Sequence, residues 1–426
     1  MEHLLFAAYL IFFAWIITRI KFFTKSGLTT PQLIIFFLLK VMAGIFYGWI
    51  GVYYGQMAQM VDTWAYHYKS ITEYELLKSD PIQFFSGLFH NTYEGGYTNF
   101  LTSKESWWND LKSNFFIKVL ALFNLFSFGH YYINLIFYSF ITLFGPVALF
   151  RIMHNIFPAK KIPVMLATFM VPSFIYWTSG LHKEGLIFLG FALIAYHLYF
   201  GFKENSFPVY RVLLILLGFS LVLILRNFLI LTLVPAIIAW MLAQKLPYRP
   251  FIIYIVVYAA SLIVFFAAKY VHPKLDFPEA VVIKQQEFLN LGGNSAVTVH
   301  KLEPTFISFL KNAPQAFGLS TLRPYPSDVR HLLSLAAAVE INLLLLLFFI
   351  FLFWRNKIQM NPFLYFCLFF SFSILMMIGY SVNILGAIVR YRSIVFPFLI
   401  VPLAAAVNWN KINQAVFGNI QSNNNI

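Results

Sequence analysis

A few ionisable side chains interrupt the apolar runs of this sequence, and their types are suited to chemistry. The turn His182-Lys183-Glu184 lies between two apolar stretches, and Arg226 separates two more. Polar groups near membrane depth are costly, so such residues mark either a functional site or a satisfied structural pair. In the structural alternative, Glu184 complements the N-terminus of the following helix, and Arg226 extends its charge to the interface.

Further basic residues precede the apolar runs 333–354 and 392–409. Two prolines flank Tyr325 and restrict the backbone beside Arg323. Glu340 enters the next apolar run, where Arg323 or Arg330 is its expected partner. The basic residues expected to share one face are Lys183, Arg226, Arg323, Arg330, Arg390 and Arg392, with His182 beside them. Arginine forks neutralise phosphate oxygens, so this set predicts a site for a phosphate or pyrophosphate on a membrane lipid.

Asp62 is the expected general base. It follows the second apolar run and stands among aromatic residues. A carboxylate in such surroundings could have a raised pKa and accept a proton. The other acids of segment 56–114 are expected to be ordinary solvated charges.

The composition indicates whether water or lipid surrounds the predicted helices. Of the 426 residues, 60% are hydrophobic and 11% charged, whereas soluble domains carry roughly 25% charged residues. The net charge of +14 comes without a nucleic-acid motif, and basic cytoplasmic loops account for most of it. The single cysteine, Cys367, can form no internal disulfide. Lipid is therefore the expected surroundings, and no nucleic-acid partner is predicted.

Apolar runs predict where the chain crosses the bilayer, since a span requires roughly 20 apolar residues. The candidate spans are 4–22, 32–55, 131–152, 163–180, 184–202, 210–226, 228–244, 250–270, 333–354, 362–381 and 392–409. The predicted fold is all-α, a polytopic transmembrane helical bundle of about eleven spans.

Basic residues concentrate in alternate connections, as they do in cytoplasmic loops. This pattern predicts an N-terminus outside, a cytoplasmic C-terminus, and two long extracytoplasmic loops, 56–114 and 271–332. The apolar stretch 115–128 is expected to be interfacial or re-entrant, because counting it as a span breaks the alternation. Residues 1–410 would form one transmembrane domain, followed by a polar cytoplasmic tail, 411–426.

Three segments carry a family resemblance. They are Ser179-Gly180-Leu181-His182-Lys183-Glu184, Leu322-Arg323-Pro324-Tyr325-Pro326 with Ala338-Val339-Glu340-Ile341-Asn342, and Val389-Arg390-Tyr391-Arg392 before Phe396-Pro397. These segments resemble those of bacterial polytopic membrane glycosyltransferases of the glycosyltransferase C type and of related surface-polysaccharide polymerases. Relatives commonly have an aspartate where this chain has Glu184, and Asp62 occupies the place of the family's acidic catalytic residue.

The resemblance implies transfer of sugar from a polyprenyl (pyro)phosphate donor to a glycan acceptor, on the outer face of a bacterial cytoplasmic (inner) membrane. Asp62, or less favourably Glu184 or Glu340, would take the acceptor proton. The donor phosphate would contact the basic set, Tyr325 would also bind substrate, and the acceptor would lie between the two long loops. The first outer loop contains no Asp-x-Asp pair to support a divalent metal, so no cofactor is predicted.

Two other classes remain open. A transporter or flippase of lipid-linked oligosaccharides would need the same cationic site but no base, and transporters usually contain internal repeats with sites at the midplane. A membrane acyltransferase would use an outer-face histidine, such as His67, His130 or His182, but no histidine-rich spacing supports it.

Overall fold

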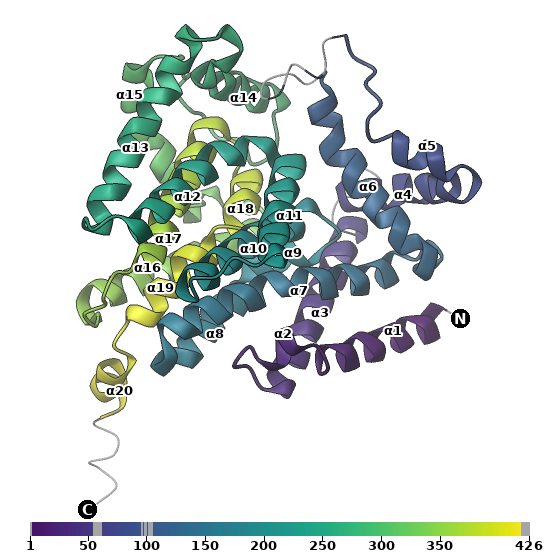
Figure 1. Ribbon diagram of the computed structural model, residues 1–426, viewed down its shortest axis with the longest axis horizontal. Helices are drawn as coiled ribbons and strands as arrows, with labels where there is room; N and C mark the ends of the chain where they lie inside the picture. Colours follow the sequence, from purple (N-terminus) through teal and green to yellow (C-terminus); the bar gives the residue numbers. More distant parts are fainter. Residues whose placement is uncertain (1, 54–61, 95–96, 98–99, 101–104, 419–426) are drawn as a thin grey trace, which may run out of the picture.

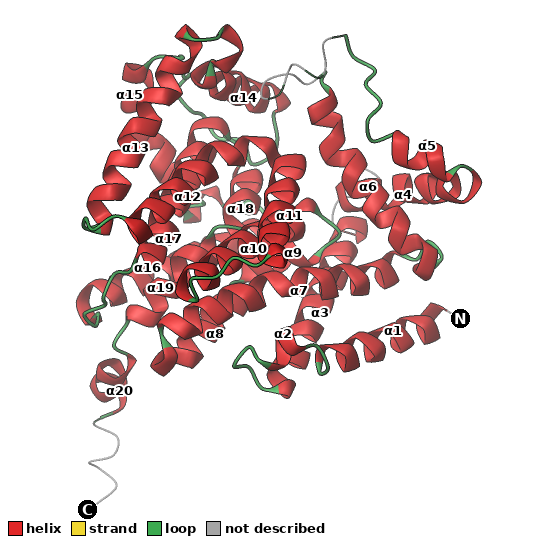
Figure 2. Cartoon of the chain, viewed as in Figure 1, coloured by secondary structure: helices red, strands yellow, loops and turns green. Residues whose placement is uncertain are grey.

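The computed structural model describes residues 2–53, 62–94, 97, 100 and 105–418. Within this part of the chain the secondary structure is helical, without β-strands (Figure 2). Two isolated β-bridges, Ala296 with Ile384 and Arg355 with Val407, join connecting segments.

The helices follow one another from the purple N-terminal end of the ribbon to its yellow C-terminal end (Figure 1). The first half contains α1 (Glu2–Ile17), α2 (Lys21–Thr24), α3 (Thr30–Tyr53), α4 (Asp62–Ser79), α5 (Pro81–Ser86), α6 (Trp107–Ser127), α7 (Tyr131–Ile156), α8 (Lys161–Phe169), α9 (Pro172–Ser179) and α10 (Lys183–Lys203). The second half contains α11 (Val209–Arg226), the 3-10 helix η3 (Asn227–Leu229), α12 (Ile230–Lys245), α13 (Pro250–Ala267), α14 (Phe277–Leu291), α15 (Phe306–Thr321), α16 (Leu332–Trp354), α17 (Pro362–Ser381), α18 (Leu385–Ser393), α19 (Phe396–Ala406) and α20 (Trp409–Phe417).

The predicted all-α, multi-pass architecture is confirmed at this level. Among the described residues, seven helices are long and apolar enough to cross a membrane, or nine if the bent pairs α8–α9 and α18–α19 each form one span. Two features separate this number from the predicted eleven. The α1 helix has 16 residues. The helices α11, η3 and α12 follow one another without a loop, so Val209–Lys245 counts as one candidate span, although the backbone of Arg226 departs from helical dihedral angles.

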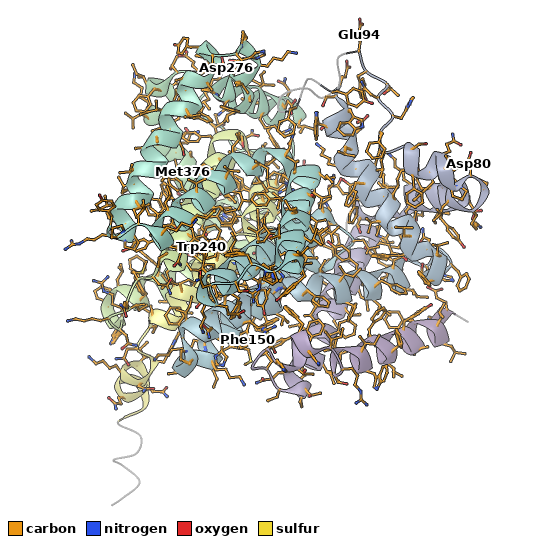
Figure 3. The ribbon with its side chains drawn as sticks, in the orientation of Figure 1. Asp80, Glu94, Phe150, Trp240, Asp276 and Met376 are labelled. Carbon is orange, nitrogen blue, oxygen red and sulfur yellow. The ribbon has the colours of Figure 1, made fainter. Side chains whose placement is uncertain are left out.

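Close helix packing depends on small residues in the middle of the bundle. The most buried candidate spans are α7 and α10. A Cβ on Gly190 of α10 would lie 2.9 Å from the Gly218 carbonyl oxygen of α11, and a Cβ on Gly218 would lie 2.7 Å from the Gly190 oxygen. Small residues let membrane helices approach closely and gain dispersion contacts. The buried Trp240 and Phe150 lie in the interior of the same assembly (Figure 3).

The two long segments between spans are largely helical and lie at one end of the molecule. The first contains α4, α5 and the start of α6, and the second contains α14 and α15. Glu94 and Asp276, one from each segment, lie at the end opposite the C-terminus (Figure 3). Backbone bonds from Val297 N to Asn383 O, 2.9 Å, and from Leu385 N to Ser295 O, 3.0 Å, attach the second segment to the start of α18.

Gly180 allows the turn between α9 and α10 to approach α3. A Cβ at this position would clash with the ring of Tyr47. The turn is also held by Lys40 of α3, whose Nζ donates to the Thr178 carbonyl oxygen at 2.6 Å and to Ser179 Oγ at 3.4 Å. The turn is therefore fixed from the α3 side.

We expect Gly180→Ala to lower the stability of the folded protein, because relieving the clash moves Tyr47 or the turn itself. Thermal unfolding in detergent, followed by fluorescence-detected gel filtration, measures the loss. Gly318→Ala in α15 is the matched control, since nothing lies within 4 Å of its added Cβ and alanine is favoured over glycine in helices by up to about 1 kcal/mol. Equal melting of the two variants would contradict this role.

Candidate functional site

The turn between α9 and α10 brings an imidazole and a carboxylate into the interior. His182 precedes the first residue of α10, and the Tyr138 hydroxyl donates to its carbonyl oxygen. Glu184 is 0% exposed and His182 is 2% exposed. Glu184 Oε2 contacts His182 Nδ1, so the two side chains form one buried unit.

Two arginines from distant parts of the chain balance the Glu184 carboxylate. Arg226, the last residue of α11, donates from Nη2 to Glu184 Oε1 at 2.6 Å. Arg390 of α18 places its Nε 3.7 Å from the same oxygen. Both arginines also face the ring of Tyr391, with guanidinium-to-centroid distances of 4.1 Å for Arg226 and 5.0 Å for Arg390. Glu184 thereby joins α10, α11 and α18 (Figure 1).

Asp62 completes the cluster from α4. Its Oδ2 lies 3.2 Å from His182 Nε2 and accepts a hydrogen bond from Arg390 Nη1 at 2.9 Å. The neighbouring residues fasten the start of α4: Thr63 Oγ1 bonds with the Tyr131 hydroxyl at 2.7 Å, and Trp64 stacks on Tyr131 at 4.0 Å. With nitrogen atoms facing both carboxylates, His182 can donate to both when it is protonated.

The expected rise in the pKa of Asp62 is not found. Burial alone would raise the pKa of Asp62. The hydrogen bond and charge of His182, together with the charges of Arg390 and Lys183, have a larger effect in the opposite direction, so the pKa of Asp62 is below its usual range. The side chain is 48% exposed, so the carboxylate is accessible from the cavity. Its lowered pKa keeps it ionised at neutral pH.

The cluster opens into a cavity of about 300 Å³. Its wall combines residues of α4, α6, α10, α11, α12, α14, α17 and α18. Among the described residues, the charged side chains of the wall are the basic Lys112, Lys183, Arg226, Lys284 and Arg390 and the acidic Asp62 and Glu287. Aromatic rings, including Tyr66, Trp108 and Tyr391, lie between them. A partly enclosed cavity with excess positive charge suits an anionic ligand.

Five of the residues predicted from the sequence meet at this cavity, and one lies directly behind it. The cavity wall includes Asp62, His182, Lys183, Arg226 and Arg390. Glu184 is behind the wall and contacts His182, Arg226 and Arg390.

Three other predicted residues lie outside the cavity. Arg323 pairs with Asp328, with an Nη1-to-Oδ1 distance of 3.7 Å, and its guanidinium lies over the Tyr325 ring at 5.1 Å. Arg330 donates to the Asn294 carbonyl oxygen at 2.8 Å. These contacts hold the second outer segment together, as expected for structural side chains.

Arg392 and Glu340 have buried environments away from the cavity. Arg392 is 0% exposed and donates from Nη1 to the carbonyl oxygens of Ser320, at 3.1 Å, and Arg323, at 2.5 Å. Glu340 accepts from the Ser173 backbone N at 2.5 Å. Arg392 interacts electrostatically with Glu340, so the charge acting on Glu340 is not the expected Arg323 or Arg330.

The sequence reasoning missed two lysines of the wall, Lys112 on α6 and Lys284 on α14. Each lies in a polar segment, where a lysine resembles an ordinary solvated charge. Helical spacing is the signal that could have identified Lys284, because Val281 and Phe288 of the same helix face are buried.

The described residues contain no group of three or more His, Cys, Asp or Glu side chains placed to hold a metal ion. The absence of a cofactor therefore stays a prediction. Comparisons with protein-family models, curated proteins and solved structures find no match. The apolar helices define a multi-pass membrane protein, and its function has to be argued from the cavity.

We expect Arg392→Met to destabilise the fold. The change leaves two buried carbonyl oxygens without this donor, and each unsatisfied buried group costs about 1–3 kcal/mol. Thermal unfolding in detergent measures the effect. Arg330→Gln is the control, since Arg330 is exposed and contacts one carbonyl. An Arg392→Met protein that melts with the wild type would show that these bonds contribute nothing.

Proposed function

We propose that the protein is a membrane glycosyltransferase or polymerase for cell-surface polysaccharide synthesis. It would transfer sugar from a polyprenyl (pyro)phosphate donor to a glycan acceptor. The observation that carries the proposal is an accessible carboxylate, Asp62, beside a cavity with excess positive charge. Such a cavity supports binding of a phosphate leaving group next to a proton acceptor.

The proposal includes a location and a topology: a bacterial inner membrane, about eleven crossings, the N-terminus outside and the C-terminus in the cytoplasm. Two observations support the sides proposed for the two termini. Glu2 Oε1 lies 3.6 Å from His130 Nδ1 in the α6–α7 connection, which puts the start of α1 beside that connection. The two long outer segments also lie at the end opposite the C-terminus (Figure 1).

The proposed transfer uses Asp62 as the base. The oxygen of an acceptor hydroxyl forms a bond to the anomeric carbon of the donor sugar, and the bond from that carbon to the donor phosphate oxygen breaks. The hydroxyl proton moves to Asp62, while the electron pair leaves with the polyprenyl (pyro)phosphate. The basic side chains of the wall stabilise the charge that develops on this leaving group.

Glu184 and Glu340 are less suited to proton transfer. Glu184 is fully buried, and its two oxygens are occupied by His182 and Arg226. Glu340 contacts the Ser173 backbone and is not part of the cavity wall. We therefore assign Glu184 a positioning role and Glu340 a structural one.

We expect Asp62→Asn to reduce glycan transfer by a factor of about 10² to 10⁴, the usual contribution of general base catalysis. Source cells lacking their own copy would be complemented with each variant, and polyprenyl-linked glycans in their membranes measured by mass spectrometry. The donor should accumulate with Asp62→Asn. Glu75→Gln is the matched control, because Glu75 is an exposed acid on the same helix.

Two outcomes would remove the enzyme assignment. The first is full product formation by Asp62→Asn. The second is wild-type protein that moves a lipid-linked oligosaccharide across proteoliposomes without joining it to an acceptor, which would indicate the transporter class.

A further inference from the structure

The basic residues of the cavity fall into two groups with different partners. Arg226 and Arg390 are bound to carboxylates: Glu184 contacts both, and Asp62 contacts Arg390. The positive charge of these arginines is therefore largely balanced within the protein. A ligand that binds near Arg226 and Arg390 therefore joins ion pairs that are already formed within the protein.

The lysines have mostly neutral partners. Lys183 Nζ donates to Ser113 Oγ at 3.3 Å and lies 4.8 Å from the centroid of the Tyr66 ring. Lys112 Nζ donates to Asn109 Oδ1 at 2.5 Å. Neither contact balances a charge.

Lys284 has one acidic partner, Glu287, at 2.7 Å on the next helical turn. The pair is half-buried, with the Lys284 side chain 39% exposed. Glu287 is thus the carboxylate in direct contact with this lysine group, whereas Glu184 and Asp62 contact the arginines and act on Lys183 only at longer range.

The lysines come from three elements and repel one another. Lys112 is on α6, Lys183 begins α10 and Lys284 is on α14. Burial, together with the charges of Lys284 and Arg226, lowers the pKa of Lys112 to about 8. Lys112 in turn opposes the charge on Lys183. Like charges held together in a partly enclosed space indicate that an anion belongs among them.

A charge balance indicates how much anion is needed. The described wall residues provide five basic groups, and the carboxylates Asp62, Glu287 and the underlying Glu184 offset three of them, which leaves an excess of two positive charges. A phosphodiester carries one negative charge, whereas a diphosphate esterified at both ends carries two. His182 adjoins two of these carboxylates and is outside this count, so the excess is at least two, which favours the doubly charged diphosphate over the singly charged phosphodiester.

We propose that Lys112, Lys183 and Lys284 form a second phosphate subsite, so that the cavity binds a diphosphate. This inference rests on the proposed function and names its donor class: a lipid diphosphate sugar rather than a lipid monophosphate sugar. The phosphate attached to the sugar lies near Arg226 and Arg390, beside Asp62. The phosphate attached to the lipid lies among the lysines.

The wall next to Lys284 is suited to the lipid end of such a donor. Val281 on the same helix, Leu231 on α12 and Met377 on α17 also line the cavity. Val281 lies one helical turn from Lys284, so an apolar side chain is available beside that lysine, whereas Asp62 contacts Arg390.

The test uses purified full-length protein in detergent with EDTA, so that each anion is free of metal. Calorimetry measures the affinity of inorganic pyrophosphate and of inorganic phosphate. We expect wild-type protein to prefer pyrophosphate by at least about tenfold, the factor that one good charge-assisted contact supplies. In Lys112→Gln/Lys284→Gln this preference should disappear, while phosphate affinity changes by less than about threefold.

Controls separate local from general effects. Lys274→Gln removes an exposed lysine of the same outer segment that is not on the cavity wall, and it should keep the preference. The single variant Lys284→Gln alters the more exposed lysine and supplies a folded comparison if the double variant melts early.

The pH dependence gives an independent readout. Besides Lys284 and Arg226, the charges acting on Lys112 are those of Glu287, Asp110 and Lys183. Since its pKa is about 8, Lys112 is charged below that pH and loses its charge above it. Pyrophosphate affinity should therefore fall between pH 7 and 9, and fall less in Lys112→Gln. Pyrophosphate itself titrates equally in both experiments, so the difference between wild type and Lys112→Gln reports the lysine alone.

Equal affinities for the two anions in wild-type protein would overturn the diphosphate assignment, as would a preference that survives in the double variant. These measurements contain no sugar donor, so they are distinct from the transfer assay. If wild-type protein prefers pyrophosphate and Asp62→Asn still transfers sugar at the full rate, the diphosphate site stands and the assignment of Asp62 as base is wrong.

Discussion

The arrangement of the cavity depends on one buried carboxylate. Glu184 is fully buried, and an ionised carboxylate removed from water is strongly unfavourable unless charged hydrogen-bond partners surround it. Those partners are Arg226 at the end of α11, Arg390 on α18 and His182 at the start of α10. Each of these elements must reach the same point for the charge to be tolerated. The need to balance this charge therefore holds α10, α11 and α18 together. His182 also contacts Asp62, which adds α4 to the same network.

The helical, multi-pass character could be predicted because long apolar runs require lipid and internal hydrogen bonding. The number of spans could not be read in the same way. Apolar content alone does not determine whether a stretch such as Val209–Lys245, which Arg226 interrupts, crosses the membrane once or twice. The helices α4 and α14 also escaped prediction, because they lie in polar segments that look like loops. Their packing against the bundle comes from a few buried positions, such as His67 and Val281.

The site was partly predictable because a charge within apolar sequence is conspicuous. This reasoning found Glu184 and Arg226, but it could not separate Arg390 from Arg392. Residues two apart on a helix face different directions. Arg390 therefore faces the cavity, whereas Arg392 turns into the core and binds backbone carbonyls. Lys112 was missed because its surroundings in the sequence are polar, so nothing distinguishes it from a solvated loop lysine, although it lies on the cavity wall.

The position of His182 changes its expected role from phosphate ligand to connector. Both ring nitrogens face carboxylates, Nδ1 toward Glu184 and Nε2 toward Asp62, and the ring is 2% exposed. An incoming phosphate would have to displace one of these contacts and leave a carboxylate unpaired. The imidazole instead transmits the fixed position of Glu184 to Asp62. It also stabilises the ionised form of Asp62, so this carboxylate is held in place and negatively charged where the cavity opens.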